Sequence, residues 1–220
     1  MIELYNADKT FIKTKLKPYL EEDNFSDIVS MLTDRVMIQK VGLETYSAAR
    51  ICAFLYDLGL PILESCKDGT ITPFMFAGTS LESIVIPSNI KTIGKGAFTG
   101  CRQLEEIIFE EGVESIQERA FSYLLIQKIE FPRSLRYIGP LAFLECDKLE
   151  SIKFKGDATF SSGTFPGGSR FGGTDYTFYV PEDVLAAGEQ SHFYYAYCTS
   201  YYVDATDPYN DPRGPKVVGY

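Results

Sequence analysis

One histidine and five cysteines are the residues in this chain best suited to act as a base, a nucleophile or a metal ligand. A Ser or Cys nucleophile usually needs a positioned base, which is most often a histidine. His192 lies in the aromatic segment "SHFYYAYC" without a catalytic motif around it, so we interpret it as a packed or surface residue. No CxxC pair occurs among the cysteines, which are Cys52, Cys66, Cys101, Cys146 and Cys198. Their odd number and spacing predict neither a disulfide framework nor a zinc site.

Two further segments carry residues that could bind a phosphate or a cation. The stretch "FPGGSRFGGTD" (165–175) is rich in glycine but lacks both phosphate-binding patterns, G-x-x-x-x-G-K-[ST] and G-x-G-x-x-G, which favours an irregular loop. Near the carboxyl end, Asp204, Asp207, Asn210 and Asp211 lack the spacing and the closing Glu of an EF-hand loop. The sequence therefore predicts a protein that is not an enzyme and that holds no cofactor and no metal.

Composition limits the classes of partner. The 220 residues are 45% hydrophobic and carry 30 acidic against 21 basic side chains, a net charge of -9. That balance opposes binding along a phosphate backbone, so we expect no direct contact with nucleic acid. The first residues lack the layout of a secretory signal, and no run reaches the roughly 18 apolar residues of a membrane span. We expect a cytoplasmic protein without membrane contact, or one in a virion or host cytoplasm if a phage encodes it.

A short phrase recurs along the middle of the chain and indicates the elements that must carry any site. "IGKGAFTGC" (93–101) returns as "IQERAFSYL" (116–124) and as "IGPLAFLEC" (138–146). Three sets of apolar positions repeat every 22 or 23 residues: Ile71, Ile93, Ile116 and Ile138; Phe76, Phe98, Phe121 and Phe143; and Leu81, Leu104, Ile126 and Leu149. A constant period of this size indicates a solenoid, in which stacked units share one core.

Each unit also contains a short alternating run, as in "LESIVIP" and "LEEIIFE". Alternation with a period of two places Ile84 and Ile86 on the inner face of a strand and Val85 on its outer face. We expect these strands to pair in parallel along the stack and the phenylalanines of the repeat to form one column. Cys101 and Cys146 follow that column by three residues, two units apart, which predicts buried packing without a disulfide.

The patterns "L-x-x-I-x-I-P" and "I-x-x-I-G-x-x-A-F-x-x-C" resemble the BspA-type leucine-rich repeat family over about residues 69–198. The resemblance implies an α+β repeat fold: a right-handed leucine-rich-repeat solenoid with a parallel sheet and a strand-lined face. Family members include bacterial surface proteins implicated in adhesion and host contact, which are normally exported. This chain differs from them in having no export signal and only about five units.

Three parts of the chain follow from these patterns. Residues 1–66 lack the repeat and are predicted to form a helical N-terminal cap or a small helical module. Its two helices cover "NFSDIVSMLTDRVMIQKVG" (24–42) and "LETYSAARICAFLYDLGLP" (43–61), and the second ends at Gly59 and Pro61. Residues 67–198 form the solenoid, about five units with an irregular closing unit. Residues 199–220 are rich in Asp, Pro and Gly and are predicted to be an extended tail.

The predicted function is non-enzymatic recognition of another protein through the outer face of the strands, with the helical end as a further contact. The alternating phase assigns eight residues to that face: Ser83, Val85, Glu106, Ile108, Lys128, Glu130, Ser151 and Lys153. Two alternatives stay open. One is a structural or self-assembling component of a larger particle, which includes a homo-oligomer, and the other is a phage or mobile-element inhibitor of a host protein.

Overall fold

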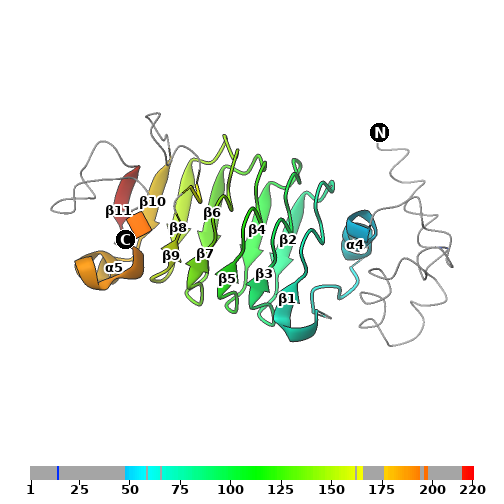
Figure 1. Cartoon of the computed structure of the whole chain (residues 1–220), viewed down its shortest axis with the longest axis horizontal. Helices are drawn as coiled ribbons and strands as arrows, with labels where there is room; N and C mark the ends of the chain where they lie inside the picture. The colour runs from blue at the N-terminus through cyan, green and yellow to red at the C-terminus, as the bar shows by residue number, and fades with distance from the viewer. Residues whose placement is uncertain are drawn as a thin grey trace.

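The chain forms a parallel β-solenoid, shown in the computed structural model of Figure 1. The structure describes Thr14 and residues 48–57, 59–64, 66–161, 163–165, 176–193, 196–197 and 215–220. Each unit contributes one short strand and one long strand, so two walls of strands run side by side along the stack (Figure 1). The fold class predicted from the repeat is confirmed. The first predicted helix, over 24–42, lies outside the described residues.

The short strands form one continuous wall of five parallel strands in the order β1-β3-β5-β7-β9. Each short strand has two residues, and the second is buried in every case. Its strands are β1 (Thr70–Ile71), β3 (Thr92–Ile93), β5 (Ser115–Ile116), β7 (Tyr137–Ile138) and β9 (Thr159–Phe160). The isoleucines of the repeat therefore lie directly above one another, as in the registers Ile71↔Ile93 and Ile116↔Ile138.

The long strands form the second wall, which is the predicted strand-lined face, in two separate sheets. β2 (Ser83–Ile86) pairs in parallel with β4 (Glu106–Phe109). β6 (Lys128–Phe131), β8 (Ser151–Phe154) and β10 (Thr177–Val180) form the other sheet, also in parallel. No ladder joins β4 to β6, although both strands are fully described. The repeat predicts one continuous sheet, and this interruption is a departure from it.

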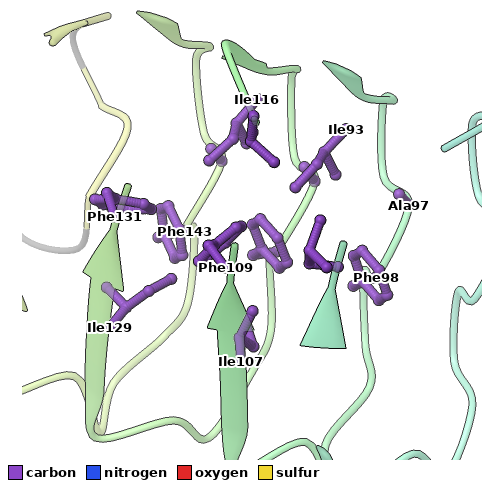
Figure 2. Close-up of a cluster of buried hydrophobic side chains, with 14 of the residues drawn as sticks. Ile93, Ala97, Phe98, Ile107, Phe109, Ile116, Ile129, Phe131 and Phe143 are labelled. Carbon is purple, nitrogen blue, oxygen red and sulfur yellow. The ribbon is translucent and has the colours of Figure 1, made fainter. Parts of the chain in front are cut away.

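The core fills the space between the two walls. The inner residues of β2, β4 and β6 alternate with exposed ones along each strand. The repeated phenylalanines stack in one column, with ring centroids 5.2 Å apart for Phe98 and Phe121 and 5.4 Å apart for Phe121 and Phe143. Figure 2 shows Phe143 beside the inner residues Phe109 and Phe131 of the long strands. The predicted phenylalanine column is confirmed.

Cys101 and Cys146 behave as buried packing residues, as the repeat predicts. Both are free thiols. Each thiol points at a main-chain carbonyl oxygen of the preceding unit, Cys101 at Phe76 (2.9 Å) and Cys146 at Phe121 (3.1 Å). Burial raises the pKa of Cys146 to about 12 and also raises the pKa of Cys101, because a charged thiolate is poorly solvated in the core.

Helix α4 (Ala48–Asp57) lies against the first unit. It is apolar on all sides from Ile51 to Leu55, and these residues join the solenoid core. The helix ends as predicted at Gly59, whose φ of +75° suits glycine. Gly59 N–H donates to the Tyr56 carbonyl and Leu60 N–H to the Leu55 carbonyl, the two bonds of a Schellman end. A 3-10 turn, η1 (Lys67–Gly69), then leads into β1.

The opposite end of the stack is closed by chain from beyond the repeats. Helix α5 (Glu182–Ala186) and the 3-10 turn η2 (Gly188–Gln190) follow β10. β11 (Lys216–Gly219) pairs in parallel with β10, so residues 216–219 of the predicted extended tail belong to the sheet. The β-branched pair Val217 and Val218 gives this segment strand propensity. The edge of β10 that does not face β8 supplies the main-chain groups with which it pairs. Residues 199–214 of the tail lie outside the described residues.

Candidate protein-binding face

The structure brings the eight predicted face residues together on the outer side of four neighbouring long strands. Backbone pairing places Ser83 beside Glu106 and Val85 beside Ile108 on β2 and β4. On β6 and β8 it places Lys128 beside Ser151 and Glu130 beside Lys153. The residues on β2, β4 and β6 are exposed, and Ser151 and Lys153 are half-buried. We call this surface the strand face. Its role in binding remains a prediction.

The end of the strand face nearest to α4 is apolar. Val85 and Ile108 are 41% and 46% exposed, and they lie opposite one another in the β2–β4 ladder. The Val85 N–H donates to the Tyr56 hydroxyl oxygen over 2.8 Å, so helix α4 satisfies a main-chain donor at the outer edge of β2. Two adjacent β-branched side chains held on a rigid ladder form a small, preorganised apolar contact surface.

The other half of the strand face is a charged and aromatic network. Glu130 accepts a hydrogen bond from Lys155 Nζ over 2.9 Å and has Lys153 Nζ at 3.9 Å. These contacts lower the pKa of Glu130, with the Lys155 hydrogen bond as the main cause. Lys153 Nζ also lies 4.3 Å from the centre of the Tyr220 ring, within the range of a cation–π contact.

Lys155 and Tyr220 belong to the strand face but were missed from the sequence. Lys155 lies just beyond the end of β8 and follows the same alternating phase as Lys153, so that phase could have identified it. Tyr220 follows β11, and its hydroxyl donates to the Phe154 carbonyl over 2.7 Å. The segment "KVVG" (216–219) carried a strand signal in its two valines, which the neighbouring Pro and Gly residues obscured.

A groove of about 380 Å³ crosses the strand face where β4 meets β6. Its floor is apolar and its walls are charged. The lining consists of Glu105, Glu106, Ile107, Ile108, Phe109, Lys128, Ile129, Glu130, Ser151, Lys153 and Lys155. Six of the eight predicted residues line it, and the other two, Ser83 and Val85, lie on β2.

A second hollow, of about 640 Å³, lies between the end of α4 and the first unit. Its walls include the carboxylates of Asp57, Glu64 and Glu82, and Ser83 connects it to the strand face. Burial raises the pKa of the Tyr56 phenol at its edge, and the nearby carboxylates of Glu64 and Asp57 contribute. The hollow therefore favours cationic groups.

Among the residues that the structure describes, no other chemistry-bearing side chains gather into a site. His192 is exposed, with Nδ1 3.0 Å from a carboxylate oxygen of Asp157. That carboxylate also accepts the main-chain N–H groups of His192 and Phe193. Within the described parts of the chain, no cluster of three or more His, Cys, Asp or Glu side chains is arranged to hold a metal ion. None of the helices in those parts is both long and apolar enough to cross a membrane.

Comparison with known proteins agrees with this geometry. The model of the BspA-type leucine-rich repeat region matches residues 69–170 with six copies. No curated protein matches the chain. Solved structures with similarity include the pneumococcal vaccine antigen PcpA, at 26% identity over 43% of this chain and 22% of that one, with a TM-score of 0.34.

Two other solved structures are similar over about half of the chain. The leucine-rich repeat protein TpLRR of T. pallidum is 25% identical over 55% of this chain and 53% of that one, with a TM-score of 0.42. A leucine-rich cell surface protein of Faecalibacterium prausnitzii A2-165 is 20% identical over 50% of this chain and 38% of that one, with a TM-score of 0.38. The chain thus covers less than two thirds of each of the three proteins. The repeat period, the two strand walls and the family match together identify residues 69–170 as a BspA-type leucine-rich repeat region.

Proposed function

We propose that this chain is a non-enzymatic protein-recognition module whose partner binds the strand face. The observation that carries the proposal is the exposed pair Val85 and Ile108, held in register on a rigid ladder beside the charged network. Leucine-rich repeat solenoids are scaffolds often used for protein interaction, and their stacked units spread contact residues over several neighbouring strands. An apolar centre with a polar surround is also the usual composition of a protein interface.

The test is capture of a partner from native host lysate, followed by mass spectrometry. The Val85→Asp/Ile108→Asp variant should lose the partner while keeping its fold, because both side chains point away from the core. The matched control is Phe74→Asp/Tyr123→Asp, which also adds two carboxylates at apolar residues 51% and 42% exposed, on turns outside the strands. Equal capture by the wild type and both variants, each with an unchanged circular dichroism spectrum, would contradict binding through the strand face.

The helical end is a second candidate contact for the same partner. The hollow beside α4 is continuous with the strand face through Ser83, so one partner could touch both surfaces. Glu64→Lys and Glu82→Lys reverse charges on its wall and should weaken capture less than the change at Val85 and Ile108. If capture is lost only with these two lysines, the partner binds the helical end.

Self-assembly is the competing proposal, and β11 favours it. β11 is the last strand of its sheet, and no other strand in the described part of the chain pairs with its outer edge. An unpaired strand edge is a template for pairing with another chain. Light scattering over a range of protein concentrations separates the two functions. A mass that stays at that of the monomer at every concentration would favour partner recognition. A mass that increases with concentration would favour a structural component.

A further inference from the structure

The unit that enters β6 differs in sequence from the units on either side of it. From the column phenylalanine to the first apolar residue of the long-strand run, the units entering β4 and β8 need six residues, as in Phe98 to Leu104 and Phe143 to Leu149. The unit entering β6 needs five, from Phe121 to Ile126. The connection to β6 is therefore one residue shorter than those of the flanking units and equal to the connection that enters β2, from Phe76 to Leu81.

The main-chain bonds that begin the pairing elsewhere are absent before β6. The length of the connection does not by itself account for this, because β2 follows an equally short connection and pairs fully with β4. Before β4, the N–H groups of Glu105 and Glu106 both donate to the Glu82 carbonyl, over 2.9 and 3.4 Å. The same bifurcated arrangement, to the Gln127 carbonyl, precedes β8. The corresponding bonds from Gln127 and Lys128 to the Glu105 carbonyl are missing, although every residue involved is described.

A proline removes the bond at the other end of β6. After β4, Glu110 N–H donates to the Ile86 carbonyl over 2.9 Å, and after β8, Lys155 N–H donates to the Phe131 carbonyl over 3.2 Å. The equivalent residue after β6 is Pro132, which has no N–H to donate. β6 therefore lacks its bonds to β4 at both ends, and we call the resulting gap the seam.

The seam exposes part of the apolar core. Ile107 and Phe109, the inner residues of β4, are 9% and 8% exposed, against 1% and 0% for the equivalent Ile84 and Ile86 of β2. Together with Ile129 they line the groove of about 380 Å³. Because this surface belongs to the core side of the wall, covering it removes apolar area from water.

The two sides of the seam carry opposite charges that do not pair. Glu105 and Glu106 stand on the β4 side and Lys128 on the β6 side, and all three line the groove. No ion pair joins any of them to another described residue, whereas Lys153 and Lys155 share Glu130. The unpaired charges are thus divided, with anions on one side of an apolar floor and a cation on the other.

From this arrangement we infer that the seam takes an extended protein segment in which one apolar side chain lies between a basic and an acidic residue. The inference rests on the proposed function and specifies its partner. The apolar side chain covers the floor formed by Ile107, Phe109 and Ile129. The basic residue faces Glu105 and Glu106, and the acidic residue faces Lys128. A second copy of the chain fits less well, because it would present its own groove to this one and leave both floors uncovered.

Short synthetic peptides test the inference with the full chain. The probes are GRGLGEG, with mixed charges, its variants GRGLGRG and GEGLGEG, and GRGSGEG, which lacks the apolar side chain. Amide chemical-shift titration suits weak binding and reports its place. We expect GRGLGEG to shift the amides of residues 105–109 and 128–131 and to bind about two- to fivefold more tightly than either same-charge peptide, as exposed ion pairs allow. Loss of the leucine should weaken binding about tenfold or more.

Charge reversal in the protein supplies the decisive comparison. Lys128→Glu makes both sides of the seam acidic, so GRGLGRG should become the preferred peptide. Glu105→Lys/Glu106→Lys makes both sides basic and should favour GEGLGEG. The matched control is Lys148→Glu, an exposed lysine on the turn before β8 that does not line the groove. It should leave the order of the peptides unchanged.

Three outcomes would overturn the inference. They are absence of binding by all the peptides, an order of affinities that Lys128→Glu does not change, and concentration-dependent dimerisation that Lys128→Glu abolishes. The last would make a second copy the occupant. If the peptides fail but Val85→Asp/Ile108→Asp still abolishes partner capture, the proposed function stands and the seam is not its anchor. If the peptides bind as expected while that variant keeps its partner, the proposed function falls.

Discussion

Removing one ring from the phenylalanine column should destabilise the whole solenoid. The change is Phe121→Ala in the middle of the stack. Phe121 is fully buried, stacks on Phe98 and Phe143 at 5.2 and 5.4 Å, and meets Phe109 edge-on at 6.2 Å. Truncation of a buried phenylalanine costs about 3–5 kcal/mol. We expect the cost for Phe121→Ala to lie in the upper part of that range, because the substitution removes two stacked contacts and one edge contact together.

Thermal unfolding followed by circular dichroism measures this effect. A domain of this size loses about 2–4 °C per kcal/mol, so a cost of about 4–5 kcal/mol should lower the Tm of Phe121→Ala by about 8–20 °C. The control is Tyr123→Ala in the same unit, whose ring is exposed and whose loss should change the free energy of unfolding by less than about 0.5 kcal/mol. Equal Tm values for the two variants would refute the packing of the column between the strand walls.

Three further predictions concern single groups. The Cys146 thiol, with its pKa raised to about 12 by burial, should react with iodoacetamide at pH 8 only in denaturant; labelling of the native chain, read by mass spectrometry, would show an open core. Gly112→Ala should cost about 2 kcal/mol or more in urea unfolding, because the new Cβ would lie 2.2 Å from the Ser88 carbonyl oxygen; an unchanged midpoint would disprove this close approach. The pKa of Glu130 is lowered, so its pairing with Lys155 stabilises the fold at pH values above the ordinary pKa of 4.5, and this stabilisation is lost as the pH falls below that value. In Glu130→Gln, the free energy of unfolding should therefore depend less on pH in this acid range. Its pH dependence near neutrality should be the same as in the wild type.

The solenoid was predictable because its signal is repeated. Each unit places Ile, Phe and Leu at nearly the same spacing, so the period can be recognised even where one unit is irregular. The inner and outer phases of the long strands follow from alternation alone, and Val85 and Ile108 lie opposite one another as the spacing requires. These features depend on local periodicity and on the fixed distance between parallel strands.

The seam and the closing strand were harder to predict because they depend on departures from the repeat. Pro132, which marks the missing donor at the end of β6, is present in the sequence. The bonds missing before β6 appear only when the bonds of neighbouring units are compared in space. β11 pairs with β10 across a long sequence separation, and a four-residue strand has too few positions for a reliable period. Tyr220 joins the strand face only as a consequence of that pairing.

Hydrogen exchange of the chain with and without its captured partner tests the central claim most directly, because it locates the contact without any mutation. If the partner binds the strand face, amides of β2, β4 and β6 should exchange more slowly in the complex, and those next to the seam should show the largest change. The short strands β3, β5 and β7, on the opposite wall, should exchange at the same rate in both states. Protection confined to residues 48–64 or to α5 and β11, with β2, β4 and β6 unchanged, would contradict the account and place the partner at an end of the stack.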